Sequence, residues 1–478
     1  MPKILCFALA ALFLASCTVG PDYVKPTPDT PPAWRLEYEA AAGLVDLAWW
    51  EGFGDPVLNG LIREALQENL DLKIAAARVD QFLGALDTTR SQFFPQISGT
   101  AAVSRQKDTE TGPTPFPAGV SSTYNTHQAY LSVSWEIDLW GRIRRATEAA
   151  RADVLSSEEG RRAVILSLAT DVANGYLTLR ALDRQLEISR DTEQAYAETL
   201  RLFRLRHQYG TISRLELSQV ESQYESARQA IPRVQSQIAQ QENLLSTLIG
   251  RNPGPISRGR TIDELAPVGI PEGLPSTLLE RRPDVLQAEQ TLIAANARIG
   301  EAKALYFPTI SLTGLLGSAS AELSKLFQGP STIWSAGASA VGPIFTFGGI
   351  SGQVKQAEAF QQQALFQYQR TVQNAFREVE DALVGTVRGR EQLAAQGRQI
   401  EALKNYARTA RLQYDGGTAN YFLVLDADRS LFDAQLSYVN TQSNVFTSLV
   451  NIYKAMGGGW VTKADRRTME AAAAGKGN

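Results

Sequence analysis

The chain contains few residues that carry out chemistry, with two cysteines, two histidines and three methionines among its 478 residues. His127 and His207 stand apart, and neither has a Cys or His neighbour at the spacing of metal ligands. The sequence also lacks a Gly-x-Ser-x-Gly elbow and a phosphate-binding P-loop. We therefore expect a protein that is not an enzyme and has neither a cofactor nor a metal site.

Long apolar runs and an excess of positive charge are missing as well. Beyond the N-terminus there is no apolar run of about 18 residues, which a transmembrane helix would need. If the chain crosses a bilayer, it must do so as a closed β-barrel. The net charge is −3, so no basic surface is predicted to bind nucleic acid.

The N-terminus reads as an export signal. Lys3 is followed by an apolar stretch over 4–14 and then by Leu-Ala-Ser before Cys17. This order predicts a lipoprotein signal peptide over 1–16, cleavage before Cys17 and a lipid on that cysteine. A lipid-anchored extended segment over 17–57 would follow. An ordinary secretory signal is the alternative. Because Cys6 leaves with the signal, no internal disulfide is expected.

The chain is internally duplicated. Three residue pairs recur at one offset of 207 residues: Gly210-Thr211 with Gly417-Thr418, Ile249-Gly250 with Met456-Gly457, and Trp140-Gly141 with Phe347-Gly348. We expect a first repeat over 58–250 and a second over 276–457. A Pro/Gly-rich linker over 251–275 would separate them, and a tail over 458–478 would follow.

Each repeat contains two predicted strands, at about 96–105 and 128–140 and at about 309–318 and 333–345. Over 128–140 apolar and polar residues alternate, which predicts a strand with one face toward lipid and one toward a lumen. Tyr130, Trp135 and Trp140 are candidates for an aromatic girdle. A half-buried sheet of a soluble domain is the alternative. Four strands cannot close a barrel, so at least three copies and twelve strands are needed.

The helices are unusually long. Apolar residues recur at spacings of three and four over 142–208 and 353–413, which predicts helices of about 90–100 Å with coiled-coil-like packing. Return helices are expected over 214–249, interrupted by Pro232, and over 421–456. The predicted fold is therefore an α+β membrane protein, with four strands per chain continued by a helical barrel. A long soluble coiled coil without a channel is the alternative.

Several motifs carry a family resemblance. They are Cys17-Thr18-Val19-Gly20-Pro21-Asp22-Tyr23, Trp49-Trp50, Leu279-Glu280-Arg281-Arg282-Pro283-Asp284-Val285 and Gly457-Gly458-Gly459-Trp460. With them the chain resembles the TolC-like outer-membrane efflux proteins, in particular the lipid-anchored outer-membrane factors of proton-driven (RND-type) tripartite pumps. In the motif over 279–285, Arg281, Arg282 and Asp284 are interpreted as structural ion pairs or caps at a helix start.

The resemblance implies a homotrimer in the outer membrane, with a twelve-stranded barrel continued into the periplasm. Its partners would be outer-membrane lipid, a periplasmic adaptor protein and an inner-membrane proton-driven pump. Its function would be an exit duct for drugs, other small molecules or metal ions. An exit duct for type I protein secretion and a periplasmic lipoprotein without a pore are the alternatives.

Two groups of site residues are expected. The turns that close the long helices would dock the adaptor; their residues are Tyr209, Gly210, Thr211, Gly416, Gly417 and Thr418. The resemblance implies a periplasmic gate with Asp426, Glu216 and Leu423, in which Asp426 forms a ring of three carboxylates and Leu423 replaces the family's second acid. Such a ring favours cations. The alternatives are that the turn glycines only close helices, and that Asp426 and Glu216 are solvated charges on helix surfaces.

Overall fold

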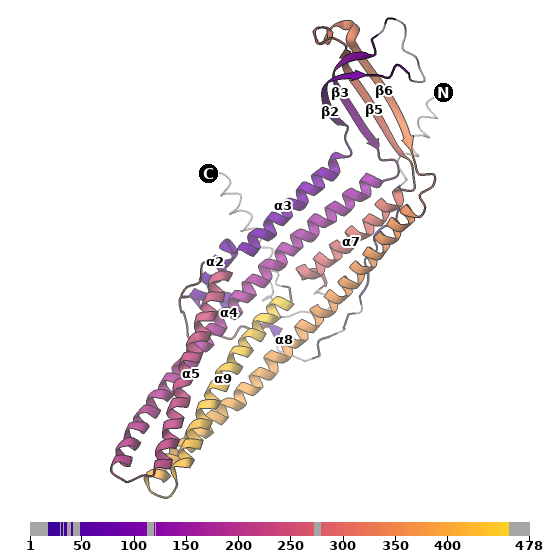
Figure 1. Ribbon diagram of the computed structural model, residues 1–478. Coiled ribbons are helices and arrows are strands. Elements are labelled where there is room, and N and C mark those ends of the chain that lie inside the picture. The colour runs from indigo at the N-terminus through magenta and orange to yellow at the C-terminus, as the bar shows by residue number, and fades with distance from the viewer. Residues whose placement is uncertain are drawn as a thin grey trace. The chain divides into compact units, whose positions relative to one another are not determined.

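The computed structural model describes residues 18–28, 30–31, 33–35, 40–41, 48–111, 119, 121–271 and 279–457 (Figure 1). The predicted signal peptide, Cys17 and the tail over 458–478 lie outside these residues. In chain order the elements are β1 (Ala40–Ala41), η2 (Trp49–Phe53), α2 (Pro56–Glu68), α3 (Leu70–Ser91), β2 (Gln96–Lys107), β3 (Thr123–Ile137), α4 (Arg142–Gln208), α5 (Arg214–Leu248), β4 (Ile270–Pro271), α7 (Pro283–Ala304), β5 (Thr309–Ser320), η3 (Leu323–Lys325), η4 (Gly329–Ser331), β6 (Thr332–Val341), α8 (Gly349–Asp415) and α9 (Tyr421–Ala455).

The chain divides into two compact units, which are not the two sequence repeats. The first unit takes the described parts of 1–27, 78–157 and 288–368, and it contains the four long strands. The second unit takes the described parts of 28–77, 158–287 and 369–478, and it contains both helical hairpins. Each unit therefore combines segments of both repeats.

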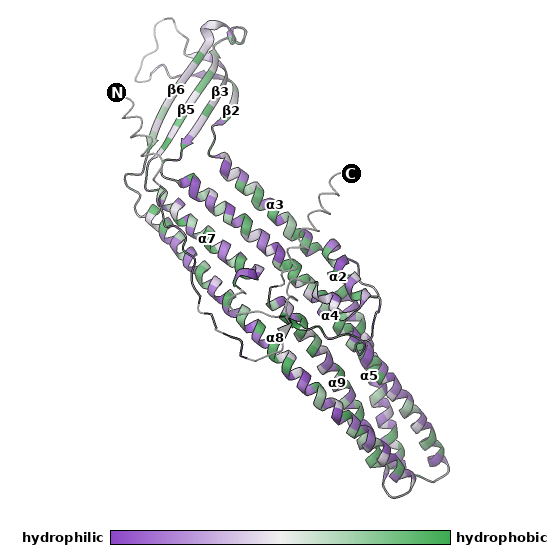
Figure 2. Ribbon diagram, turned by 180° about the vertical axis from the view of Figure 1, so that it is seen from behind, coloured by the Kyte–Doolittle hydropathy of each residue, from purple (hydrophilic) through white to green (hydrophobic). Residues whose placement is uncertain are grey.

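The sheet of the first unit is antiparallel, with strand order β2-β3-β5-β6. Residues of one register row, such as Gln96, Ser134, Thr313 and Gly337, share a face across all four strands. That face is polar, whereas the opposite face carries mainly apolar residues, and Figure 2 shows the alternation along the strands. Among the described strands, β2 and β6 each have a partner on one side only, so both edges of the sheet are open.

All four strands differ in length from the prediction: β2 and β5 each end two residues later, and the bounds of β3 and β6 differ more. β3 begins at Thr123, before the predicted 128, and it ends at Ile137, before the predicted 140. The strand ends there because the Asp138 carboxylate accepts hydrogen bonds from the backbone N–H groups of Ile143 and Arg144 and so starts α4. β6 ends at Val341 instead of continuing to 345, since Gly342-Pro343 follows and proline has no N–H to donate to a ladder.

The predicted aromatic girdle needs one correction. Tyr130 lies on the polar face, where it covers Gly317 of β5; a Cβ at Gly317 would come within 2.4 Å of the Tyr130 Cβ. Trp135 lies on the apolar face, and its indole donates to the Phe93 carbonyl. Trp334, which the sequence did not single out, lies on the apolar face and is 76% exposed.

The long helices α4 and α8 each contain 67 residues, which corresponds to about 100 Å. α8 begins at Gly349, before the predicted 353. The predicted interruption of the first return helix at Pro232 is wrong, because α5 continues through that residue to Leu248. In the second unit α4 and α5 form one hairpin and α8 and α9 form another (Figure 1).

The core of the second unit forms around η2 and α2. Trp49, Trp50 and Phe53 are buried, and the Trp49 ring stacks on Tyr453 of α9 with centroids 5.5 Å apart. The fully buried Asp55 carboxylate caps α2, and it accepts hydrogen bonds from the Tyr176 hydroxyl at 2.8 Å and the Arg260 N–H at 2.9 Å. This network ties the linker after α5 to the long helix α4.

Candidate functional site

The two turns at the hairpin ends have the same geometry. Gly210 and Gly417 both have φ of 72°, a left-handed conformation that suits glycine. At the first turn the N–H groups of Gly210 and Thr211 donate to the carbonyls of His207 and Arg206. At the second, Gly417 and Thr418 donate to Tyr414 and Gln413. Both turns are Schellman motifs, so the repeated glycine and threonine have a structural reason.

The turns also present an open surface. A Cβ at Gly210 or Gly417 would meet no atom of the described residues within 4 Å, and the Tyr209 side chain is 78% exposed. Gly416 differs, since a Cβ there would lie 3.3 Å from the Leu412 carbonyl oxygen. The left-handed backbone therefore favours glycine at 210 and 417, while the space around both is free among the described residues.

The helix after the first turn begins with a capping box. The Ser213 hydroxyl accepts a hydrogen bond from the Glu216 N–H at 3.2 Å, and the Glu216 carboxylate accepts from the Ser213 N–H at 2.8 Å. Among the described residues Glu216 forms no ion pair. Its geometry gives Glu216 a structural role, which the Ser-x-x-Glu spacing could have revealed.

Asp426 lies on α9 and is partly exposed. Its carboxylate accepts a hydrogen bond from the Tyr406 hydroxyl of α8 at 3.3 Å and pairs with Arg429 one turn later at 3.4 Å. Leu423, one turn earlier, packs against the apolar cluster at the hairpin ends. Asp426 and Leu423 thus share one stretch of α9, and within the described part of the chain no hydrogen bond or ion pair joins Asp426 to Glu216.

An aromatic cluster joins the two hairpins. Phe203 of α4 packs against Tyr421 of α9 and Tyr414 of α8, with ring centroids 4.3 Å and 6.1 Å away. The Arg206 guanidinium donates to the Tyr414 hydroxyl at 3.3 Å and lies 5.7 Å from the centre of the Phe203 ring. These contacts bring the two predicted turns together in one unit.

Asp428 is a charged residue that the sequence did not single out. Burial raises the pKa of its carboxyl to about 6, and the nearby Arg411 only partly offsets this effect. Burial raises the pKa of Tyr196 on α4 and of Tyr421 on α9, and the negative charge of Asp428 raises both further. The sequence alone did not indicate that Asp428 is buried, because the residues that bury its carboxyl group come from other helices.

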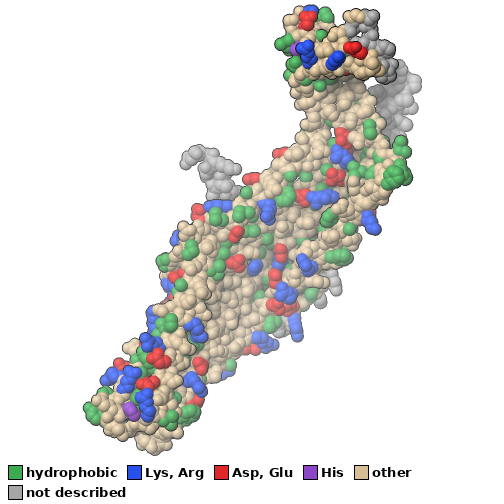
Figure 3. Space-filling view, in the orientation of Figure 1, with side chains coloured by type: hydrophobic (Ala, Val, Ile, Leu, Met, Phe, Trp, Pro, Cys, Tyr) green, Lys and Arg blue, Asp and Glu red, His purple; other side chains and the backbone are tan. Residues whose placement is uncertain are grey.

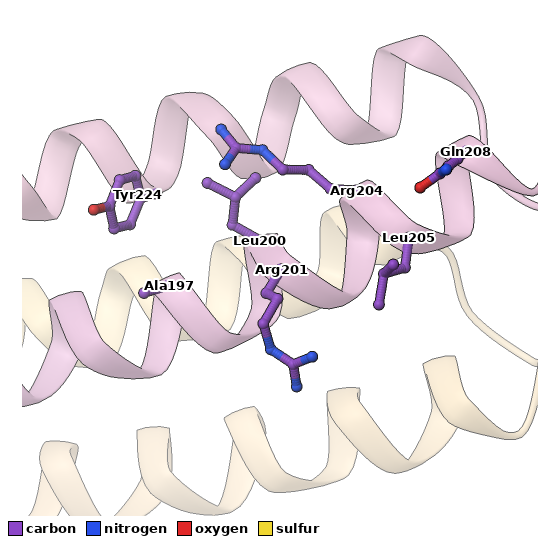
Figure 4. Close-up of a pocket in the computed structure, with 7 residues that line it drawn as sticks. All are labelled: Ala197, Leu200, Arg201, Arg204, Leu205, Gln208 and Tyr224. Atoms are coloured by element: carbon purple, nitrogen blue, oxygen red, sulfur yellow. The ribbon is translucent and has the colours of Figure 1, made fainter.

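A shallow hollow of about 400 Å³ lies on the first hairpin, just before the turn (Figure 4). Leu200, Leu205 and Tyr224 supply its apolar surface, while Arg201 and Arg204 extend from α4. Glu198 pairs with Arg201 at 3.2 Å and Glu221 with Arg204 at 3.7 Å, so the arginines are partly neutralised. The hollow is therefore amphipathic and adjoins the exposed Tyr209.

The Arg-Arg-Pro-Asp motif forms a buried bridge. Arg282 is 5% exposed; its guanidinium pairs with Asp284 at 2.7 Å and Glu378 at 2.8 Å, and it donates to the Ala455 carbonyl at 2.9 Å. It therefore links the start of α7 to α8 and to the end of α9.

No helix in the described ranges is both long enough and apolar enough to cross a membrane. Likewise, the described residues contain no group of three or more His, Cys, Asp or Glu side chains that could hold a metal ion.

Comparison with known proteins decides the family. The model of a family described as outer membrane efflux protein matches residues 61–251 and 274–458. The chain belongs to the outer membrane efflux protein family. The prediction of an outer-membrane efflux channel without enzymatic activity is thereby confirmed, as is a helix-rich fold with four antiparallel strands.

Three similar proteins cover nearly the whole of this outer membrane efflux protein. The toluene efflux pump outer membrane protein TtgC of Pseudomonas putida is 34% identical over 98% of both chains. The cation efflux system protein CusC of Escherichia coli is 34% identical over 96% of this chain and 99% of its own. The crystal structure of the Campylobacter jejuni CmeC outer membrane channel matches with a TM-score of 0.87 at 27% identity, covering 95% of this chain and 98% of that one.

Proposed function

We propose that this outer membrane efflux protein closes as a homotrimer into a twelve-stranded barrel and serves as the exit duct of a tripartite pump. The observation that carries the proposal is the four-stranded sheet with one polar face, one apolar face and two open edges. Open edges invite pairing with another chain, and three copies would remove them all. Detergent-extracted protein should have about three times the mass of one chain, and it should conduct in planar bilayers; a non-conducting monomer would refute the proposal.

The turns at the hairpin ends are the proposed docking site of a periplasmic adaptor, which links the duct to a proton-driven inner-membrane pump. The free space around Gly210 and Gly417, the exposed Tyr209 and the adjoining hollow support this assignment. The Gly210→Leu/Gly417→Leu double variant should form trimers but lose efflux. Gly210→Asn/Gly417→Asn should retain more, because asparagine tolerates the left-handed conformation.

A matched control lies between β2 and β3, outside both helical hairpins. Gly119 also has positive φ, at 86°, and no atom of the described residues within 4 Å of an added Cβ. Gly119→Leu should leave efflux unchanged, because Gly119 belongs to neither of the proposed docking turns. Normal efflux in the double leucine variant would contradict docking at the turns.

Asp426 is the proposed gate residue, with Leu423 beside it. In a trimer three Asp426 carboxylates would be related by symmetry, and such a ring favours cations and binds divalent ions. Asp426→Ala should raise single-channel conductance and weaken cation selectivity and divalent block. Glu198→Ala is the control, because this acid lies on α4 with its side chain 70% exposed and paired to Arg201. Wild-type conductance, selectivity and block in Asp426→Ala would remove it from the constriction.

Glu216 is proposed to act on the gate only through the capping box that starts α5. Glu216→Gln retains a side chain that can accept the Ser213 N–H, whereas Glu216→Ala does not. If Glu216 instead contributes charge to the entrance, the glutamine variant should change cation selectivity as much as the alanine variant does.

Cys17 is the proposed lipid anchor in the outer membrane. Two residues after Cys17, the Val19 N–H donates a backbone hydrogen bond to the Trp140 carbonyl at 3.1 Å, which ties the start of the mature chain to the end of the sheet. Cys17→Ser should abolish acylation, while the strands should keep the protein in the membrane. Complete release into the periplasm would contradict the barrel.

The proposed substrates are small organic molecules. The polar sheet face offers mainly Ser, Thr, Gln and Gly. Thioether and imidazole ligands for metals are few, because Met456 is buried and the chain has two histidines. Relatives are named for both toluene and cation efflux, so the test must separate the two. The gene should restore solvent or drug tolerance, but not metal tolerance, to strains that lack the corresponding channel; the reverse result would refute the assignment.

A further inference from the structure

The two open edges of the sheet bring two loops to the same end. β2 runs away from α3 and β6 runs toward α8, so residues 93–95 before β2 and 342–348 after β6 both lie at the helix end of the sheet. If β6 of one copy pairs with β2 of the next, the two strands lie about 5 Å apart. The loop after β6 then becomes a neighbour of the loop before β2 in the next copy.

The loop after β6 presents apolar side chains that the described part of its own chain leaves uncovered. Ile344, Phe345 and Phe347 are 101%, 73% and 90% exposed, and the two phenylalanine rings contact edge to face with centroids 4.3 Å apart. Figure 3 shows hydrophobic side chains gathered at the join of β6 and α8. Phe347 has φ of 49°, and it is the one non-glycine residue with positive φ in the described part of the chain. Such a conformation costs energy and needs a compensating contact. We call residues 344–347 the aromatic knuckle.

The loop before β2 borders a hollow of about 420 Å³ between the end of α3 and the start of α4. Its lining residues include Phe93, Phe94, Arg90, Arg144, Arg151 and Thr147. Phe94 is 67% exposed, and the buried Thr147 hydroxyl has no hydrogen-bond partner among the described residues. Arginines and phenylalanines together suit an aromatic guest, because guanidinium groups interact favourably with ring faces. The hollow therefore has the chemistry to receive an aromatic side chain from outside its own two helices.

We propose that Phe345 and Phe347 of one copy insert into this hollow of the next copy, so that the aromatic knuckle fastens the barrel closure at the helix end. The proposal rests on the proposed trimer and adds the partner of a specific surface. The partner that fills the hollow is a second copy of this chain, because pairing of the open edges places the aromatic knuckle of one copy next to the hollow of the next. A knuckle immersed in lipid is the competing outcome.

Cysteine cross-linking tests the contact directly. The full-length protein with Phe345→Cys and Phe94→Cys, expressed in membranes and treated with a short bis-maleimide, should yield covalent dimers and trimers. Each single variant should stay monomeric in denaturing gels. Phe327→Cys with Phe94→Cys is the matched control, because Phe327 is 82% exposed but lies in the loop between β5 and β6 at the opposite end. A trimeric double variant without cross-linked species would overturn the proposal.

A second measurement separates this contact from the trimer itself. Phe345→Ala/Phe347→Ala should lower the temperature at which trimers dissociate by about 5 °C or more, while Phe327→Ala should leave it unchanged. Native mass measures assembly of the wild type, so a monomeric wild type would refute the trimer and the knuckle contact together. Two results would overturn the knuckle contact alone while the wild type stays trimeric. One is an unchanged dissociation temperature in the double alanine variant, and the other is modification of the Phe345→Cys thiol by a lipid-phase reagent.

Discussion

The ion pair between Glu136 and Arg142 allows a sharp test of the barrel lumen. By register, Glu136 lies on the polar face of β3, and it is the one charged residue of that face within the four described strands. Arg142 donates two parallel hydrogen bonds to its carboxylate, Nε to Oε1 at 3.0 Å and Nη2 to Oε2 at 2.8 Å. Each side chain is 28% exposed. Because of this pair, the polar face of the four described strands carries no unpaired charge.

Removing the charge of Arg142 should uncover three carboxylates in a trimer. In water, a carboxylate attracts a monovalent cation at 5 Å with about 0.8 kcal/mol, which corresponds to about a fourfold local enrichment. The same carboxylate repels an anion with equal energy, so anions are depleted about fourfold. Arg142→Gln should accordingly raise the cation-over-anion permeability ratio by up to about sixteenfold at low salt. At 1 M salt the Debye length falls to about 3 Å, so most of the change should disappear.

The assay is the reversal potential of single channels in a KCl gradient. Glu136→Gln/Arg142→Gln should restore the wild-type reversal potential, since neither charge remains. Lys107→Gln is the matched control, because this change removes the same charge from the opposite sheet face. An Arg142→Gln channel with wild-type selectivity at low salt would refute the lumen orientation of Glu136.

Three further predictions concern stability. Asp428 has a pKa of about 6 in the folded protein, above the ordinary value near 4, so its ionisation opposes folding increasingly as pH rises from 4 to 6. Asp428→Asn should remove this pH dependence. Thermal melts at pH 7 should show the trimer of this variant stabilised by about 2 kcal/mol. Arg282→Lys cannot reach Asp284, Glu378 and the Ala455 carbonyl together and should cost about 2 kcal/mol, whereas Arg281→Lys should be neutral; equal melting temperatures would exclude the bridge. Gly300→Ala places a Cβ 2.6 Å from the Val19 carbonyl oxygen and should make the N-terminal segment accessible to proteases. If this contact is unimportant, the segment should resist proteolysis as it does in the wild type.

The helices were the most predictable part of the fold. The stretch that forms α4 has no proline and keeps apolar spacings of three and four, so local sequence and burial favour the same structure. Strand ends were less predictable. Around Asn125 and His127 the residues are polar on both faces, so the alternation that marks a strand is lost although β3 continues there.

The site was predictable where chemistry is local. The two Schellman turns follow from a glycine after a long helix, and the Ser213–Glu216 capping box could have been found from its spacing. Asp428 and the hollow beside Phe94 were not predictable. Their properties depend on side chains that are brought together from other helices, and a single sequence does not indicate which residues those are.

The duplication preserves the turns but not the helix starts that follow them. Ser213 caps α5 with its side chain, whereas Asn420 makes no side-chain cap for α9. A lost cap costs about 1 kcal/mol, and the buried Asp428 adds a further cost at neutral pH. Both costs fall on the hairpin that carries Asp426. We therefore expect the first turn of α9 to open more readily than that of α5, and amide hydrogen exchange at pH 7 should be faster over 421–424 than over 214–217. Asp428→Asn should slow exchange in the second hairpin alone; equal exchange in both hairpins of the wild type would contradict the unequal division of stability.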